Sequence, residues 1–329
     1  MKLDFEAIKS LTVGAVFVSK RDDGVMEFNK CSKRQIEAWH KFGDAVLAMR
    51  AKTTTGVRID FHTNSGFLAF KTSSGAKFEL LIDGKIRERF VSDSAGSINA
   101  RVELRDPRGD KKEDIRVTLV FPSHSIGSLE YIEIDDGAYA IAHEYERSIL
   151  FIGDSITQGY NSYYDSLSFA WRVTKYYDAK SVINGIGGAF YQPETFDKVD
   201  FDPDTVIIAY GTNDAMRFSK ISDMQNRVSG YLDLVKESYG NKRVIVISPI
   251  WRADSEGRPC NSDFAEKRLM VEKEAKDRGF EVICGLDLVD PIKEYFADTY
   301  LHPNDLGFAA YAENLIKIME SNERKNRNG

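Results

Sequence analysis

Residues that could carry out acyl-transfer chemistry stand in short polar segments of the second half of the chain. In "ILFIGDSITQGY", Ser155 follows an apolar run directly. A serine hydroxyl is a weak nucleophile until a neighbouring base takes its proton. His302 is the only one of the five histidines that lies beyond His143. If this half of the chain performs serine chemistry with a histidine base, that base is therefore His302.

Two further segments could stabilise the negative charge that attack on an ester places on the carbonyl oxygen. Gly188 lies within "NGIGGAF" and Asn213 lies within "GTNDA". A glycine N–H can approach the oxygen with no Cβ in the way, and an asparagine amide donates without adding a permanent charge. The candidate donors are the backbone N–H groups of Ser155 and Gly188 and the side chain of Asn213.

These polar segments follow the strands of a predicted parallel sheet. From Arg147 onward, the apolar runs "SILFI", "SVING", "TVIIAY", "RVIVIS" and "FEVICG" alternate with helical segments. Helices are expected near residues 166–177, 222–239, 263–278 and 305–320. Continuous apolar strands are typical of a parallel sheet that helices cover on both faces, and such sheets bind ligands at the carboxyl ends of their strands.

The first half has a different rhythm. In "GVRIDFH", Val57, Ile59 and Phe61 alternate with polar residues, as in a half-buried strand, and similar short runs continue to about residue 139. One helix is expected after Ser32, because Ser32 and Gln35 form a possible capping box and apolar residues then recur at helical spacing. We predict an N-terminal β-sandwich or jelly-roll-like domain with one helix over residues 1–145 and an α/β domain over residues 146–329.

Four blocks of the second half resemble the SGNH, or GDSL-type, hydrolase superfamily of esterases, lipases and carbohydrate deacetylases. In chain order the blocks are Gly153-Asp154-Ser155, Gly188 within "GIGG", Gly211-Thr212-Asn213-Asp214, and His302-Pro303. The resemblance spans about residues 147–320. It implies a three-layer parallel-sheet domain, Ser155 as nucleophile and His302 as base. It also implies an oxyanion hole formed by Ser155, Gly188 and Asn213.

The acid that would orient His302 departs from the family pattern. The superfamily carries it three residues before the histidine, where this chain has Thr299, and Asp298 stands one place further back. Either the loop bulges so that Asp298 reaches the His302 ring, or a Ser-His dyad works with a backbone carbonyl. We favour Asp298 and keep Asp290 in reserve.

Each of these residues also has a purely structural explanation. Ser155 could be a turn serine that caps a helix, Asp214 an N-cap, and His302-Pro303 the start of the last helix. Asp154, Tyr191 and Trp251 are candidate substrate-binding residues, although Asp154 could instead bind backbone amides and hold its loop. We expect no metal site and no cofactor. A dinucleotide site is disfavoured because "GDSITQG" lacks the middle glycine of the fingerprint.

The amino-acid composition disfavours two classes of binding partner. A net charge of -6 and a pI near 5.6 disfavour nucleic acid and anionic membranes. No signal peptide and no apolar run of about 18 residues is visible, and three dispersed cysteines predict reduced thiols in a cytoplasmic protein. A homo-oligomer is compatible with the sequence.

The predicted activity is hydrolysis of short acyl esters, O-acetyl in particular, on a small molecule or oligosaccharide. A β domain before an SGNH domain resembles the layout of two-domain carbohydrate deacetylases. The alternatives are a lysophospholipase or thioesterase, or a non-catalytic carbohydrate-binding protein.

Overall fold

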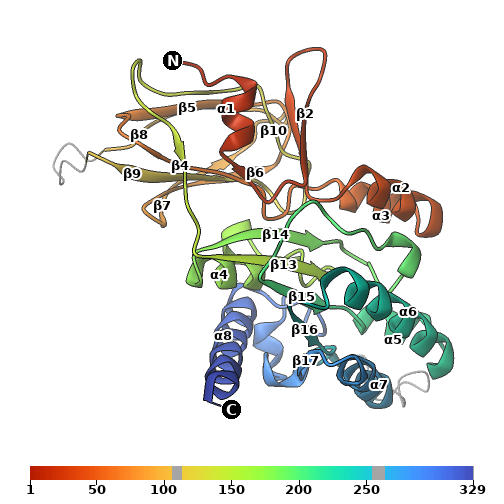
Figure 1. Cartoon of the computed structure of the whole chain (residues 1–329). Helices are drawn as coiled ribbons and strands as arrows, with labels where there is room; N and C mark the ends of the chain where they lie inside the picture. The colour runs from red at the N-terminus through yellow and green to blue at the C-terminus, as the bar shows by residue number, and fades with distance from the viewer. Residues whose placement is uncertain (106–112, 254–263, 329) are drawn as a thin grey trace.

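The computed structural model describes residues 1–105, 113–253 and 264–328. A β-rich part, red to yellow in Figure 1, lies against an α/β part, green to blue. Antiparallel sheets in the first part and a parallel sheet in the second confirm the predicted fold class. Cys260 and the expected helix start at residue 263 lie outside the described residues.

The described residues of the β-rich part form three antiparallel sheets. The first contains β1 (Thr12–Val13), β4 (Arg58–Thr63), β6 (Lys77–Ile82), β7 (Lys85–Val91), β9 (Ile115–Val120) and β12 (Ile141–Ala142). Its order is β1–β4–β9–β6–β7, with β12 paired to β4. The second sheet contains β5 (Phe67–Thr72), β8 (Ile98–Glu103) and β11 (Tyr131–Glu133), and the third contains β2 (Phe17–Lys20), β3 (Met26–Asn29) and β10 (Ser128–Leu129). Apolar side chains of all three sheets enclose one core, for example Ile59, Phe70 and Phe28.

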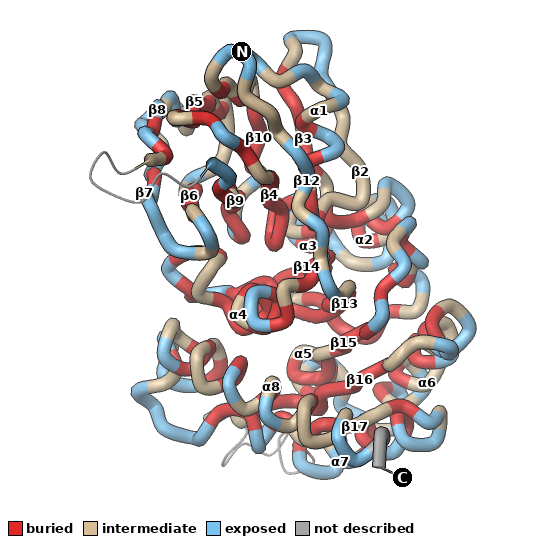
Figure 2. The backbone as a smooth tube through the Cα atoms, turned by 60° about the vertical axis from the view of Figure 1, so that its left-hand side comes forward, coloured by how far each residue is buried: buried red, intermediate tan, exposed pale blue. Residues whose placement is uncertain are grey.

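Strand β4 is buried on both faces, unlike the half-buried strand that its alternating sequence predicts. Ile59 and Phe61 face the β core, but Arg58 and Asp60 are only 2% and 1% exposed. The α/β part covers this second face, and an Arg58 guanidinium N–H donates to the Ala179 carbonyl at 2.8 Å. The polar residues of β4 therefore form part of the contact between the two parts. The tube of β4 is coloured mostly as buried in Figure 2.

The single helix expected after Ser32 is two helices, α2 (Lys33–Phe42) and α3 (Ala45–Ala51). The chain breaks at Gly43, where a Cβ would lie 2.7 Å from the Trp39 carbonyl, and the Asp44 carboxylate then accepts from the Leu47 N–H to cap α3. A short helix, α1 (Phe5–Ser10), precedes the first strand. Trp39 and Leu47 are buried in the core of the α/β part, so α2 and α3 belong to that core by packing.

Over the residues that the structure describes, the α/β part is a five-stranded parallel sheet between two helical layers. Its strands, in the order β14–β13–β15–β16–β17, are β13 (Arg147–Gly153), β14 (Ala179–Gly185), β15 (Thr205–Ala209), β16 (Arg243–Ile247) and β17 (Glu281–Ile283). Its helices are α4 (Phe169–Tyr176), α5 (Thr212–Arg217), α6 (Ile221–Tyr239), α7 (Phe264–Asp277) and α8 (Asp305–Asn328). Short helical turns occur at Asp165–Leu167, Pro193–Thr195, Gly285–Asp287 and Lys293–Tyr295.

The helical layers follow from the alternation of side chains along each strand. Leu150 and Ile152 pack with α6 and α7 on one face, whereas Ile149 and Phe151 pack with α4 and α8 on the other. The two layers lie to the right and left of the sheet in Figure 1. The register pairs Gly153 with Gly185 and with Ala209, so three strands end together at one edge of the sheet.

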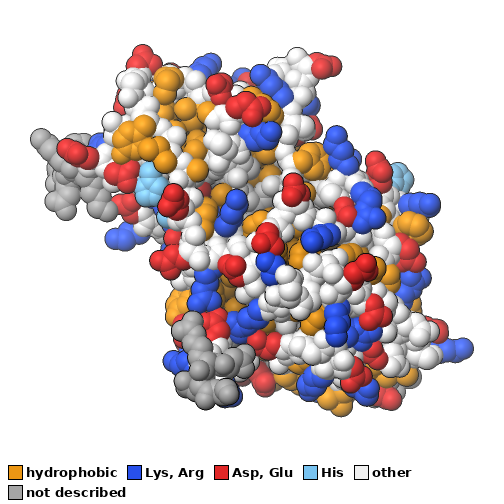
Figure 3. Space-filling model, viewed as in Figure 1, with side chains coloured by type: hydrophobic (Ala, Val, Ile, Leu, Met, Phe, Trp, Pro, Cys, Tyr) orange, Lys and Arg blue, Asp and Glu red, His pale blue; other side chains and the backbone are white. Residues whose placement is uncertain are grey.

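The surface carries both signs of charge. Acidic and basic side chains are interspersed over the face that Figure 3 shows. Within the described ranges, no helix has the length and apolar character needed to cross a bilayer. Cys31 and Cys284 are free thiols.

Candidate active site

Ser155 lies on a tight turn directly after strand β13 of the parallel sheet. Gly153 admits no side chain, since a Cβ there would lie 2.0 Å from the Thr157 hydroxyl and 2.8 Å from the Ala209 carbonyl. The turn closes through hydrogen bonds from the Gln158 N–H to the Asp154 carbonyl and from the Tyr160 N–H to the Ser155 carbonyl. Ser155 is 6% exposed. A fixed, nearly buried turn therefore holds the hydroxyl at the carboxyl edge of the sheet, where ligands bind in this architecture.

Three side chains form a continuous hydrogen-bonded row at this edge. The Ser155 hydroxyl oxygen lies 2.9 Å from His302 Nε2, and His302 Nδ1 lies 2.5 Å from Asp298 Oδ2. Ser155 and His302 are separated by 147 residues, so tertiary folding brings them together. With Nδ1 protonated toward the carboxylate, Nε2 is free to accept the serine proton, which is the arrangement that serine nucleophiles require.

A bulge in the loop brings Asp298 to the histidine. Thr299 has a φ of +64°, in the left-handed region that threonine rarely adopts. The other Asp298 oxygen accepts from the backbone N–H groups of Tyr300, Leu301 and His302 at 3.1, 2.8 and 3.0 Å. The extra residue between acid and histidine is thus absorbed by a turn that the same carboxylate stabilises.

These contacts also keep the carboxylate ionised. Partial burial alone would raise the pKa of Asp298, but the Leu301 N–H, the His302 ring and two further backbone N–H groups outweigh it and hold the pKa below its ordinary value. The reserve acid, Asp290, is exposed, and the ring nitrogen of His302 contacts Asp298 instead.

The three candidate oxyanion donors lie on the loops that follow β13, β14 and β15. Among the described residues, the backbone N–H groups of Ser155 and Gly188 have no acceptor. The Asn213 amide donates one hydrogen to the Ala189 carbonyl at 2.9 Å. This hydrogen bond orients the Asn213 amide and leaves its second N–H available to another acceptor. Gly188 has a φ of +86°, which glycine adopts without strain. These free donors could stabilise an oxyanion near Ser155.

Two of the three predicted substrate-binding residues, Tyr191 and Asp154, are buried, and their role in substrate binding stays a prediction. Tyr191 is fully buried, because the segment after β14 turns beneath α6, and its ring packs edge-on against Tyr210 and Tyr231 at 5.3 and 5.5 Å. Asp154 is 2% exposed and accepts from the Ile156 N–H at 2.9 Å, so it holds its loop instead of meeting solvent. Burial, together with the nearby Asp214 carboxyl, raises the pKa of Asp154 to about 7.

Trp251, the third predicted substrate-binding residue, is partly buried. Its ring packs on Phe296 with the centroids 5.0 Å apart. Its role in substrate binding stays a prediction.

Two rings to which the sequence assigned no site role lie beside the catalytic candidates. The Tyr160 ring lies 4.9 Å from the His302 ring, and the His124 ring of the β-rich part lies 5.6 Å from Tyr160. Tyr160 is 42% exposed and could meet a substrate. Its place directly after the serine loop was a usable signal. Nothing local marks His124, because it follows β9 and reaches the site only through tertiary packing.

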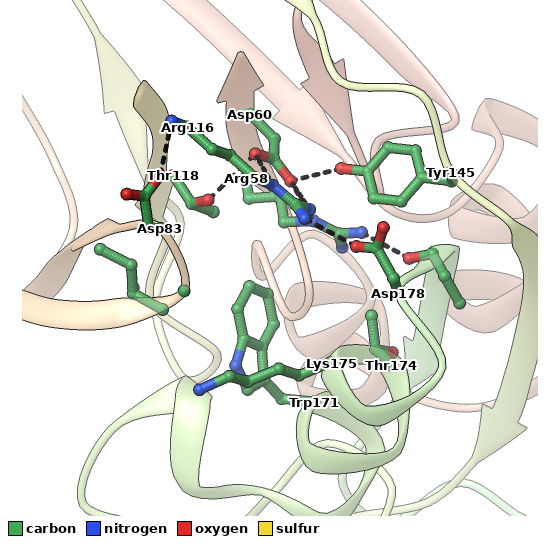
Figure 4. A pocket seen from close by; sticks show the side chains of 13 residues that line it. Arg58, Asp60, Asp83, Arg116, Thr118, Tyr145, Trp171, Thr174, Lys175 and Asp178 are labelled. Atoms are coloured by element: carbon green, nitrogen blue, oxygen red, sulfur yellow. Dashed lines mark hydrogen bonds and ion pairs between the residues drawn. The ribbon is translucent and has the colours of Figure 1, made fainter. Parts of the chain in front are cut away.

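A separate cavity of about 280 Å³ lies between the two parts (Figure 4). Its lining includes Arg58, Asp60, Arg116, Tyr145, Trp171 and Asp178. The Arg116 guanidinium donates to both oxygens of Asp60 at 2.9 and 2.7 Å and to Asp178 at 2.7 Å. Burial alone would raise the pKa of Asp60, but Arg116 and Arg58 lower it to about 2. Because Asp178 precedes β14, this paired network lies at the edge of the sheet opposite Ser155 and joins the two parts.

No cluster of three or more histidine, cysteine, aspartate or glutamate side chains in residues 1–105, 113–253 and 264–328 has a metal-binding arrangement. The side chains gathered around Ser155 are sufficient by type for proton transfer and oxyanion stabilisation.

Comparison with known proteins places the site in a family context. Residues 151–310 match the model of the GDSL-like lipase/acylhydrolase family. This stretch contains Ser155, Gly188, Asn213, Asp298 and His302. No curated protein sequence matches the chain.

Solved structures share the fold over most of the chain. A salicylyl-acyltransferase from a tetracycline biosynthetic pathway is 19% identical with a TM-score of 0.79, and 94% of each chain is covered. A family two carbohydrate esterase from Cellvibrio japonicus is 15% identical with a TM-score of 0.64, and 96% of each chain is covered. An acetyl xylan esterase from the rumen bacterium Butyrivibrio proteoclasticus is 16% identical with a TM-score of 0.62, over 81% of this chain and 89% of that one.

Proposed function

We propose that this hydrolase of ester bonds removes short acyl groups, acetyl in particular, from a carbohydrate by serine catalysis. Residues 151–310 match the model of the GDSL-like lipase/acylhydrolase family, which supports acyl-ester chemistry. The observation that carries the proposal is the row Ser155–His302–Asp298, with contacts of 2.9 and 2.5 Å. It supports a nucleophile, a base and an orienting acid in hydrogen-bond reach of one another.

The mechanism has two acyl-transfer steps. His302 Nε2 takes the hydroxyl proton as Ser155 attacks the acyl carbonyl, and Asp298 stabilises the imidazolium that forms. The N–H groups of Ser155 and Gly188 and the Asn213 amide stabilise the oxyanion of the tetrahedral intermediate. The imidazolium then gives its proton to the departing sugar oxygen, which leaves an acyl ester on Ser155.

Water completes the cycle. His302 takes a proton from the attacking water, a second tetrahedral intermediate forms, and its collapse returns the proton to Ser155 and releases the free acid.

The carbohydrate part of the proposal rests on two supports. The solved structures with this fold include a family two carbohydrate esterase and an acetyl xylan esterase by their printed names. In addition, the exposed ring of Tyr160 beside His302 offers a flat surface of the kind on which a sugar ring can stack.

A substrate panel tests the proposal. We expect acetate release from acetylated oligosaccharides, and a rate that falls as the acyl chain of p-nitrophenyl esters lengthens. Ser155→Ala should lose about 10⁴–10⁶-fold in kcat, because residues that act as a unit fail together. Preference for lysophospholipids or acyl thioesters would contradict the carbohydrate assignment, and a fully active Ser155→Ala variant would contradict the mechanism.

A further inference from the structure

The peptide group between Gly187 and Gly188 is held by a residue from the first half of the chain. The Arg50 guanidinium, at the end of α3, donates to the Gly187 carbonyl oxygen at 2.8 Å. Arg50 lies 137 residues earlier in the chain than Gly187. It is half-buried, and among the described residues it has no carboxylate partner. Its positive charge is therefore directed at a backbone carbonyl.

That carbonyl belongs to the same peptide group as the Gly188 N–H, one of the candidate oxyanion donors. In a trans peptide the C=O and the following N–H point in opposite directions, and no cis peptide occurs among the described residues. Arg50 binds the carbonyl side, so it turns the Gly188 N–H away from itself. In the described part of the chain, the Gly188 N–H has no acceptor, as is also true of the Ser155 N–H.

A second contact fixes the preceding peptide group. The Gly187 N–H donates to the Gln158 side-chain oxygen at 2.7 Å, and the Gln158 amide donates to the Thr53 hydroxyl at 3.2 Å. The Thr53 hydroxyl in turn donates to the Arg50 carbonyl at 2.9 Å. Arg50, Thr53, Gln158 and Gly187 thus form a closed hydrogen-bonded circuit that links α3, the serine loop and the Gly187–Gly188 turn.

Helix α3 is well placed to hold the arginine. Leu47, Ala48 and Ala51 are buried in the core of the α/β part, and the Asp44 side chain caps the helix. An ideal Cβ on Gly188 would lie 3.2 Å from the guanidinium and 3.4 Å from Leu47, so α3 forms a wall directly beside the turn.

We propose that Arg50 is a positioning residue for the oxyanion hole, which orients and polarises the Gly187–Gly188 peptide so that the Gly188 N–H is a better donor. A charged donor on the carbonyl draws electron density from the peptide and strengthens its N–H as a donor. The gain is realised when negative charge develops on the substrate oxygen, so it acts on the transition state and not on substrate binding. The inference rests on the proposed function.

Steady-state kinetics with p-nitrophenyl acetate test it. Arg50→Ala should lower kcat by about 10- to 100-fold, less than the roughly 10²–10³ that loss of a direct donor costs, while KM changes by less than about threefold. Arg50→Met, which keeps the apolar stem without the charge, should match Arg50→Ala. Arg50→Lys, which keeps a charged donor, should recover part of the loss.

A matched control and a transition-state probe separate this role from a structural one. Arg34 on α2 also bridges to the α/β part, by donating to the Phe196 carbonyl and the Asp197 carboxylate, but it does not contact the Gly187–Gly188 turn. Arg34→Ala should keep kcat within about twofold. A short alkylboronic acid, which forms a tetrahedral adduct with an active serine, should bind Arg50→Ala more weakly by the same factor as kcat/KM falls.

The outcomes divide clearly. A wild-type kcat in Arg50→Ala, a loss confined to KM, or an unchanged boronic acid affinity would overturn the inference. If Arg50→Ala does not fold, judged by circular dichroism, Arg50→Met and Arg50→Lys decide the matter. If Ser155→Ala is inactive and Arg50→Ala is unimpaired, only this inference fails. If the wild type cleaves no ester, or Ser155→Ala retains activity, the proposed function fails with it.

Discussion

Replacing Asp298 by asparagine separates the orienting role of the carboxylate from its role in the loop. The amide side chain introduced by Asp298→Asn would keep one oxygen for the backbone N–H groups of Tyr300, Leu301 and His302. It would place an NH₂ group against His302 Nδ1, where the carboxylate now accepts. The imidazole would then carry its proton on Nε2, which faces Ser155, and the base could no longer accept the hydroxyl proton.

The size of the effect can be worked out from these contacts. The wrong tautomer is worth about 10⁴ in kcat when the same exchange is made in serine proteases, or about 5.5 kcal/mol at roughly 1.4 kcal/mol per tenfold. The fold should change little in Asp298→Asn, because a side-chain oxygen remains to accept from the three backbone N–H groups. Asp298→Ala removes the oxygen that accepts from three backbone N–H groups, at about 1 kcal/mol per hydrogen bond, so it should lose up to about 3 kcal/mol of unfolding free energy. The true loss should be smaller, since the side chain is 21% exposed and water can reach these groups.

Two measurements on the same preparations check this reasoning. The kcat for p-nitrophenyl acetate should fall in both variants, whereas the free energy of unfolding in urea should fall clearly only in Asp298→Ala. A kcat for Asp298→Asn within tenfold of the wild type would refute the tautomer argument and return the site to a Ser-His dyad.

Three other changes have expected outcomes. Gly188→Ala, with a Cβ 3.2 Å from Arg50 and a φ of +86°, should displace the N–H and lower kcat, measured on p-nitrophenyl acetate, by about 10²–10³. Asp60→Asn should cost about 3–5 kcal/mol of unfolding free energy at pH 7, because Arg116 loses its buried partner. In the wild type, the Asp60 pKa of about 2 in place of 3.8 contributes about 2 kcal/mol to the free energy of unfolding. This contribution is present above pH 4 and is lost as the pH falls through 2. Denaturation in urea across that pH range should show no such loss in Asp60→Asn. Burial raises the pKa of Asp214 to about 7, so the stability it contributes is full below pH 4 and lost as the pH rises through 7. Relative to the wild type, Asp214→Asn should therefore become more stable between pH 5 and pH 8 in the same assay.

The sequence could predict that the polar loops lie close together, because the strands of a parallel sheet all run in the same direction. Apolar runs identify the strands, and a parallel sheet puts their carboxyl ends at one edge. The pairing of Gly153 with Gly185 and Ala209 realises this arrangement. Ser155, Gly188 and Asn213 follow those ends, so sequence order alone was enough to bring their loops together.

Details that depend on backbone conformation or on burial were less accessible. Whether Asp298 reaches His302 depends on a left-handed threonine, which the residue type disfavours and only the completed hydrogen bonds stabilise. Tyr191 follows a strand end as the candidate site residues Ser155, Gly188 and Asn213 do. A strand end specifies position along the sheet, however, and not whether the side chain turns toward solvent or toward α6.

Tertiary contacts between distant segments were the least predictable, and they bear on how the domains should be defined. Helical spacing indicates that residues 33–51 have an apolar face, but it does not say which core that face joins. Trp39 and Leu47 pack in the α/β core, and Arg50 binds the turn that carries Gly188. Separating the chain between residues 145 and 146 would expose that core to solvent and remove the hydrogen bond from Arg50 to the Gly187 carbonyl. We infer that the boundary marks a change of sequence rhythm, whereas the unit able to perform the chemistry includes α2 and α3.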